Sequence, residues 1–138
     1  MGLRRKSREI ALQFLFGHDF QQRAGDLESI EAELTEFGAN FDAGRKALPY
    51  VRQLVRGICS HLDEINASLA GHSHNWRLER MSLVDRNILR IAVFEMRYCD
   101  DVPARVAINE ALEIAKRYSI ADSVPFINGI LDAVQENS

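Results

Sequence analysis

Hydrophobic residues recur along this chain every three or four positions, the spacing that places side chains on one face of an α-helix. The clearest stripe begins near Pro49 and ends before Gly71, and it predicts one long helix. Its members are Val51, Leu54, Val55, Ile58, Leu62, Ile65 and Leu69. A shorter stripe from Leu27 to Phe37 ends at Gly38, a residue type that commonly follows a helix. No segment of the sequence shows the sustained alternation that is typical of strands.

The remaining helices are predicted from the same spacing and from residues that begin or end helices. Ser82 and Asp85 have the spacing of a capping box. They precede Ile88 to Met96, where seven of nine residues are apolar, as in a helix surrounded by other helices. The other predicted helices are Leu3 to Gln22, a short piece at Trp76 to Met81, Ala104 to Tyr118 with Tyr118 facing inward, and the segment that follows Asp122-Ser123. The predicted fold is all-α, a single-domain bundle of six to seven helices over residues 1–138.

Composition excludes several classes of protein, whereas the distribution of charge keeps the nucleic-acid-binding class among the candidates. The 138 residues are 46% hydrophobic and 27% charged, which excludes a disordered or low-complexity chain. The net charge of −3 argues, taken whole, against a nucleic-acid binder. The charges are segregated, however: residues 1–25 hold five basic and two acidic residues, residues 26–44 six acidic and no basic ones, and residues 45–60 four basic and no acidic ones. Local basic segments therefore keep nucleic acid open as a partner.

Four cations lie within five positions at the start of the first helix: Arg4, Arg5, Lys6 and Arg8. The helix dipole disfavours each by a few tenths to about 1 kcal/mol, so helix stability does not explain them. A phosphate partner does, because basic side chains beside exposed N–H groups form an anion site. Phe14 and Phe16 follow, and a ring at the edge of the helix could stack on a base. The alternative is a basic segment that only keeps the chain soluble.

Two interpretations apply to Asp122-Ser123, which precede Pro125. In one, Asp122 is an ordinary N-cap of the last helix. In the other, the hydroxyl and the free N–H groups of the helix start face a ligand. The sequence leaves both open.

Catalytic and metal motifs are absent from the sequence. It contains no G-x-S-x-G elbow, no H-E-x-x-H pair and no dinucleotide fingerprint. The His72-x-His74 pair has no third ligand at a suitable spacing, and Cys59 and Cys99 form no metal motif or disulfide framework. We expect no catalysis, no cofactor and no metal. No membrane span or signal peptide is recognisable, so a cytoplasmic location with reduced thiols is expected.

Three C-terminal motifs together resemble the NusB family of bacterial transcription antitermination factors. They are DRNILRIAVFE from Asp85, DVPARVAINEA from Asp101 and DSxxFINGILD from Asp122, in compatible order and spacing. The N-terminal RRKSRE from Arg4 fits the same family. The resemblance is strong over about 76–134, fair over 3–16 and weak between them.

This resemblance implies an all-helical, non-enzymatic protein that binds boxA RNA together with NusE, a small-subunit ribosomal protein, within an RNA polymerase antitermination complex. It implies the following RNA-binding residues: Arg4, Arg5, Lys6, Arg8, Phe16, Asp122, Ser123 and Phe126. Phe16 stands where the family often has a tyrosine, which keeps the stacking ring and loses the hydroxyl. Val124-Pro125 replaces a polar and basic pair, which removes one phosphate contact. Asp85 and the turn at Pro103 fall on the surface that faces NusE.

Two other functions remain as alternatives. One is a helical adaptor that binds only proteins. The other is the accessory domain of a ribosomal RNA cytosine methyltransferase, whose catalytic domain 138 residues cannot also contain. A DNA-binding helix-turn-helix is disfavoured because no compact basic recognition helix appears. The sequence does not decide between a monomer and a homodimer.

Overall fold

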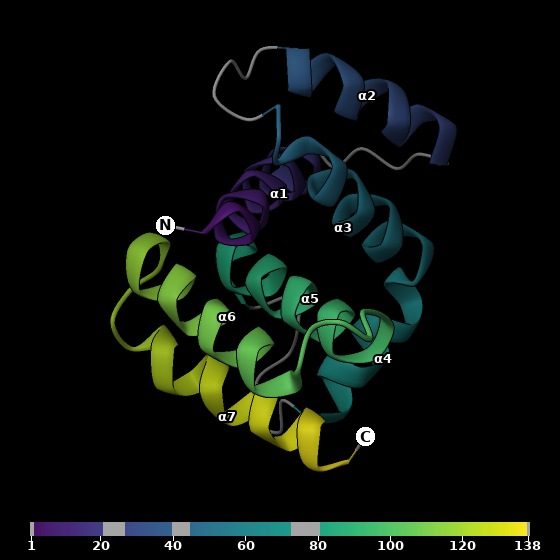
Figure 1. Cartoon of the computed structure of the whole chain (residues 1–138). Coiled ribbons are helices and arrows are strands. Elements are labelled where there is room, and N and C mark those ends of the chain that lie inside the picture. Colours follow the sequence, from purple (N-terminus) through teal and green to yellow (C-terminus); the bar gives the residue numbers. More distant parts are fainter. Residues whose placement is uncertain (1, 21–26, 40–44, 73–80, 138) are drawn as a thin grey trace. The chain divides into compact units, whose positions relative to one another are not determined.

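All the regular elements in the described part of the chain are α-helices (Figure 1). The computed structural model describes residues 2–20, 27–39, 45–72 and 81–137. The helices are α1 (Leu3–Phe20), α2 (Leu27–Ala39), α3 (Leu48–Ser60), α4 (Leu62–His72), α5 (Leu83–Tyr98), α6 (Ala104–Tyr118) and α7 (Ser123–Glu136). The all-α prediction and the expected number of helices are confirmed. The helices group into two compact units, residues 1–60 and 61–138, and each is described by itself. A single domain stays a prediction.

The first unit is organised around α3, against which both α1 and α2 pack. The apolar stripe predicted from the sequence supplies its interior, because Val51, Leu54 and Val55 are fully buried. A polar contact also joins α1 to the start of α3, where the Ser7 hydroxyl donates to the Ala47 carbonyl at 3.1 Å. At the outer edge, Arg56 Nε lies 2.7 Å from a carboxylate oxygen of Glu31 on α2.

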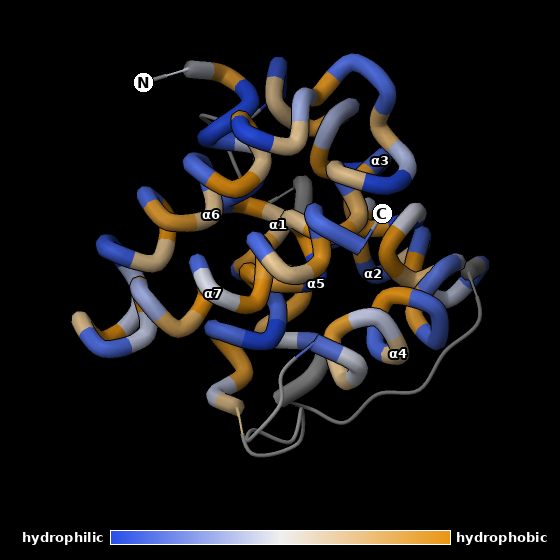
Figure 2. Tube along the Cα trace, turned by 90° about the horizontal axis from the view of Figure 1, so that it is seen from below, coloured by the Kyte–Doolittle hydropathy of each residue, from blue (hydrophilic) through white to orange (hydrophobic). Residues whose placement is uncertain are grey.

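In the second unit, α5 packs against α4, α6 and α7, and the antiparallel helices α6 and α7 lie side by side (Figure 1). The prediction of a surrounded helix is confirmed, since every residue from 87 to 95 is buried. Burying Arg90 requires hydrogen bonds. Its guanidinium donates to Asn66 at 3.0 Å and to Asn87 at 3.1 Å. Hydrophobic and hydrophilic positions interchange every few residues along the helices (Figure 2).

The long helix predicted from Pro49 onward is wrong as a single element. The structure ends α3 at Ser60 and begins α4 at Leu62, with His61 between them. The carbonyl of His61 accepts the first bond of the new helix, from the Ile65 N–H at 2.9 Å. Ile58 and Ile65 on either side of the break are both buried. The apolar stripe therefore continues across His61, although the helix is interrupted there.

Smaller differences concern helix ends and one aromatic residue. Gly38 does not follow α2, because the helix continues to Ala39. Tyr118 is 40% exposed, so its predicted place in the core is wrong. The buried residues of α6 include Ile108 and Ile114. The predicted end of the first helix at Gln22 and the predicted helical piece at 76–80 lie outside the described residues.

Candidate nucleic-acid interface

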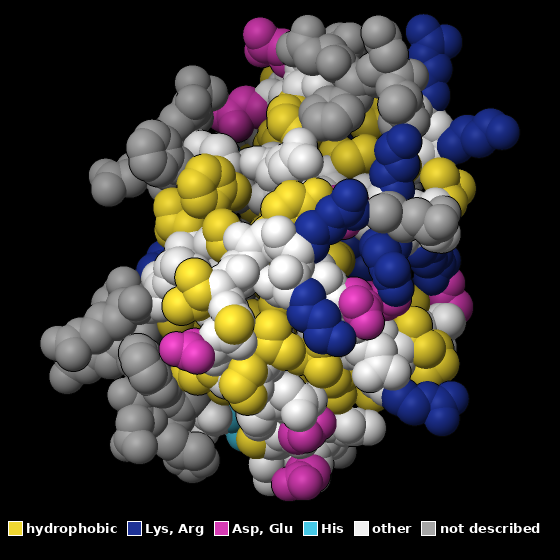
Figure 3. Space-filling view, turned by 90° about the vertical axis from the view of Figure 1, so that its left-hand side faces the viewer, with side chains coloured by type: hydrophobic (Ala, Val, Ile, Leu, Met, Phe, Trp, Pro, Cys, Tyr) yellow, Lys and Arg dark blue, Asp and Glu magenta, His cyan; other side chains and the backbone are white. Residues whose placement is uncertain are grey.

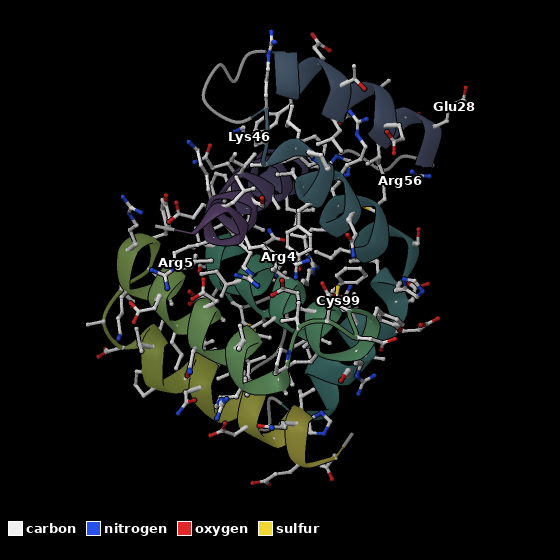
Figure 4. The ribbon with its side chains drawn as sticks, viewed as in Figure 1. Arg4, Arg5, Glu28, Lys46, Arg56 and Cys99 are labelled. Carbon is white, nitrogen blue, oxygen red and sulfur yellow. The ribbon has the colours of Figure 1, made fainter. Side chains whose placement is uncertain are left out.

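The basic segment forms the first two turns of α1, and its cations differ in accessibility. Arg4 is exposed, and Arg5 and Lys6 are half-buried. The Arg4 guanidinium lies over the Tyr50 ring on α3, with its carbon 4.3 Å from the ring centroid. Such a cation–π contact is worth about 0.5–1 kcal/mol at an exposed site. The start of α1 therefore presents positive charge in a partly fixed position (Figure 4).

Arg8 departs from the role expected for it. Its side chain is 4% exposed, and its neighbours Ser7 and Glu9 are buried as well. An arginine this deeply buried does not offer its guanidinium to an RNA backbone in the structure as it stands. The accessible part of the segment is therefore Arg4, Arg5 and Lys6, and a contact from Arg8 stays a prediction.

The large apolar residues from Phe14 to Phe16 on α1 divide between the core and the surface, as expected from the sequence. Phe14 and Leu15 are 6% and 4% exposed, whereas Phe16 is 38% exposed. Phe14 packs edge-on against Phe37 of α2, with ring centroids 5.4 Å apart. Phe16 is thus the ring of this group that a base could reach, about 18 Å along the helix from Arg4.

At the start of α7, Ser123 is part of a hydrogen-bonded cluster centred on Asp85. Both Ser119, at the end of α6, and Ser123 donate their hydroxyls to the Asp85 carboxylate, Ser123 at 2.7 Å. Asp85 is 8% exposed and Ser123 is 6% exposed. The backbone N–H of Asp85 in turn donates to Ser82 at 3.0 Å, which is the predicted N-cap of α5. The cluster fixes the turn between α6 and α7 against the start of α5.

This cluster disagrees with the interpretation in which the hydroxyl and the free N–H groups at the start of α7 face a ligand. The Ser123 hydroxyl is engaged by Asp85, the Ser123 and Val124 N–H groups donate to Ile120 and Ala121 carbonyls at 3.0 and 3.3 Å, and Pro125 has no N–H. Asp122 stands at the N-cap position of α7, but its side chain makes no capping hydrogen bond. Asp122 is exposed and available to solvent. Direct phosphate binding by this backbone is therefore not the chemistry of the site.

The same region of the second unit holds a pocket of about 380 Å³. Its lining contains Met81, Ser82, Asp85, Ile120, Asp122, Ser123 and Phe126. The pocket therefore brings together Asp85, predicted to face NusE, and three predicted RNA-binding residues, Asp122, Ser123 and Phe126. Phe126 is half-buried and Ile120 is 70% exposed, so the pocket combines an apolar wall with the hydroxyl and carboxylate groups of the cluster. Such a surface suits a flat, unpaired base better than a phosphate.

The predicted site residues divide between the two units. Arg4, Arg5, Lys6, Arg8 and Phe16 belong to the first, and the pocket residues belong to the second. The predicted NusE-facing residues also lie in the second, where Pro103 is exposed and Asp85 is buried. Burial leaves the Asp85 carboxylate little surface for a partner, so its direct contact with NusE stays a prediction.

Sequence reasoning missed Ser119 and Ile120 and gave no role to Arg45 and Lys46. Ser119 bonds to a residue 34 positions earlier, which no local pattern reveals. Ile120 is an exposed hydrophobic residue in a turn, and in the sequence it resembles a core position. Arg45 and Lys46 were visible as part of a basic block and are exposed in the structure.

The described residues offer neither a metal site nor a membrane span. They contain no group of three or more His, Cys, Asp or Glu side chains able to hold a metal ion. In the same part of the chain, no helix combines the length and the hydropathy that crossing a membrane requires. Lys and Arg side chains stand out from the face shown in Figure 3.

Comparison with known proteins agrees with the motifs. The model of the NusB family matches residues 5–136. The chain belongs to the NusB family. A transcription antitermination protein NusB of Desulfosudis oleivorans is 49% identical over 137 residues, which are 99% of this chain and 87% of that protein.

Solved structures of NusB proteins share the fold. NusB of T. maritima superposes with a TM-score of 0.82 at 35% identity and covers 96% of this chain and 90% of its own. A NusB chain crystallised with NusE and double-stranded RNA has a TM-score of 0.80, with 99% and 98% coverage. At 23% identity this second likeness concerns the fold alone.

Proposed function

We propose that this chain is a transcription antitermination factor that binds boxA-type single-stranded RNA together with NusE and so supports read-through by RNA polymerase. Membership of the NusB family and its relatives named as antitermination proteins support this function. In it the chain binds and does not catalyse, and it works in the cytoplasm, where nascent bacterial RNA is made. The observation that carries the RNA role is the accessible cationic start of α1, with Arg4 held over Tyr50.

The two units contribute different chemistry in this proposal. The start of α1 supplies sequence-independent attraction to phosphates through Arg4, Arg5 and Lys6. The pocket beside Phe126 and the exposed ring of Phe16 supply surfaces on which unpaired bases stack, which is how proteins read single-stranded RNA. Pro103 and the buried Asp85 belong to the side of the second unit assigned to NusE. Affinity for RNA alone is modest, because few cations are available and the whole chain carries a net charge of −3.

A salt titration tests the RNA role. Binding of boxA RNA and of a scrambled RNA is measured by fluorescence anisotropy at several salt concentrations, with and without NusE. Each phosphate contact contributes about 0.7 to the log–log salt slope with single strands, so Arg4→Ala/Arg5→Ala lowers the slope by about 1.4. The matched control is Arg52→Ala/Arg56→Ala, which removes the same charge from two α3 arginines that lie 3.9 and 2.7 Å from Glu31.

The control is expected to keep the wild-type slope, and circular dichroism checks that both variants keep their helix content. An unchanged slope in Arg4→Ala/Arg5→Ala would exclude the start of α1 as the RNA surface. Equal binding of scrambled and boxA RNA in the presence of NusE would argue against boxA specificity.

A further inference from the structure

Two cations before α3 have no role in the function proposed above. Arg45 and Lys46 lie in the turn that leads into the helix, and both are exposed. Within the part of the chain that the structure describes, neither has an ion-pair or hydrogen-bond partner. Arg52 and Arg56 on α3, in contrast, share the Glu31 carboxylate of α2 as an ion-pair partner. The turn therefore presents positive charge that no described acid offsets.

Two contacts fix this turn beside the start of α1. The Ser7 hydroxyl of α1 donates to the carbonyl of Ala47, the residue that follows Lys46, at 3.1 Å. One turn away on each helix, the Arg4 guanidinium lies 4.3 Å from the centroid of the Tyr50 ring. The first turns of α1 and α3 therefore pack together, so the backbones that carry the two sets of cations are neighbours within the first unit.

The charge at this surface is unfavourable in the free protein. The N-terminal end of a helix carries a partial positive charge, which acidic residues in the first turn usually offset. Neither α1 nor α3 has an acidic residue there. Instead, cations lie at or just before both helix starts. Each adds repulsion at low salt, which a bound polyanion would relieve.

The arrangement of the side chains favours an extended polyanion over a single phosphate. Lys46 extends outward from the turn before α3 (Figure 4). The side chains of Arg4 and Arg5, at the start of α1, extend in a different direction from that of Lys46. One phosphate group could not contact both sets of side chains. A single-stranded backbone, which carries a phosphate at every nucleotide, could pass from one set to the other.

We infer that Arg45 and Lys46 bind phosphates of nucleotides that flank the boxA element, continuing the RNA path that begins at the start of α1. This rests on the proposed function, because the same RNA occupies both parts of the surface. The RNA-binding site would then include a second segment, about forty positions after Arg4 in the sequence. Contacts from this segment to phosphates contribute affinity without reading bases.

The test compares two RNAs, a boxA RNA without flanks and the same RNA with six uridines added at each end. Salt slopes are measured by fluorescence anisotropy for the full chain and for Arg45→Ala/Lys46→Ala. With the extended RNA the variant is expected to lose about 1.4 from the log–log slope, which corresponds to two phosphate contacts. With the unextended RNA its slope is expected to equal that of the wild type. Arg52→Ala/Arg56→Ala, with the same change in charge, is expected to match the wild type with both RNAs.

Three outcomes would overturn the inference and leave the proposed function standing. The first is an unchanged slope for Arg45→Ala/Lys46→Ala with the extended RNA. The second is an equal loss in Arg52→Ala/Arg56→Ala, which would mean that net charge matters and position does not. The third is the same loss with the unextended RNA, which would place the contacts within boxA. Failure of the wild-type chain to bind either RNA would instead refute the proposed function itself.

Discussion

Asp85 shows how a single buried carboxylate can organise a candidate site. Burying a carboxylate is costly unless hydrogen bonds compensate it, and Asp85 receives two, from Ser119 and Ser123. The sequence predicted Asp85 as one half of a capping box. The structure confirms the hydrogen bond from the Asp85 N–H to the Ser82 hydroxyl. The Asp85 carboxylate instead accepts from Ser119 and Ser123, which lie 34 and 38 positions away. Local spacing could not reveal that choice, because it depends on how α5, α6 and α7 pack.

Replacing Asp85 is therefore expected to destabilise the fold. The two hydrogen bonds to this charged group contribute about 1.5–3 kcal/mol each. Because removing the carboxylate also removes the cost of burying it, Asp85→Ala lowers the free energy of unfolding by less than their sum, by about 2–4 kcal/mol. Urea denaturation followed by circular dichroism measures the loss. The control is Asp122→Ala, since Asp122 is exposed and makes no cap hydrogen bond, and its effect stays within about 0.5 kcal/mol. Equal stabilities of the two variants would contradict a structural role for the cluster.

Tyr98 offers a test of local electrostatics. Its hydroxyl donates to a carboxylate oxygen of Glu64 at 2.7 Å, and this hydrogen bond raises the pKa of Tyr98 above the ordinary value of 10.0. Because the pKa is higher in the folded state, the stabilisation is complete below pH 10 and is lost as the pH rises through the raised value. Absorbance at 295 nm is expected to show a late-titrating tyrosine. Tyr98→Phe removes that component and Glu64→Ala moves it to lower pH. Loss of only an early component in Tyr98→Phe would contradict the contact.

At the scale of elements, periodicity predicted most helices but joined α3 and α4 into one. The segment Ala104 to Tyr118 was predicted with the bounds that α6 has. The break between α3 and α4 was missed, because Ile58, Leu62 and Ile65 keep helical spacing through His61. Only the backbone leaves the helix there, and one residue without a breaker such as proline gives no sequence signal.

Gly129 in the middle of α7 provides a prediction about helix stability. A Cβ added there would meet no described atom within 4 Å, and the position is exposed. Alanine is better than glycine inside a helix by about 0.5–1 kcal/mol, since glycine loses more backbone entropy on folding. Gly129→Ala is therefore expected to raise the free energy of unfolding by about that amount in urea denaturation. Destabilisation would indicate that another part of the chain contacts this position.

For the whole molecule, the net charge of −3 conceals the local groups of cations on which the proposed RNA binding depends. The cations at the start of α1 were predictable from the sequence, as was the group around Asp122 and Phe126. Two properties were not. Arg8 is buried within the same basic run that exposes Arg4, and the hydroxyl of Ser123 is engaged by Asp85. Both depend on tertiary packing, which gives adjacent residues of one charge or polarity different surroundings.

Cooperation between RNA and NusE is the last prediction, and it concerns the chain as a whole. A few accessible cations on a negatively charged chain bind RNA weakly, so NusE must add affinity for the complex to form. NusE is expected to tighten boxA RNA binding by about 5–150-fold, or 1–3 kcal/mol of coupling. Because coupling is reciprocal, boxA RNA must tighten NusE binding by the same factor. Isothermal titration calorimetry of all four binding steps measures both factors. Scrambled RNA, as the control, leaves NusE affinity unchanged, and a factor of one in both directions would mean that the two partners bind independently.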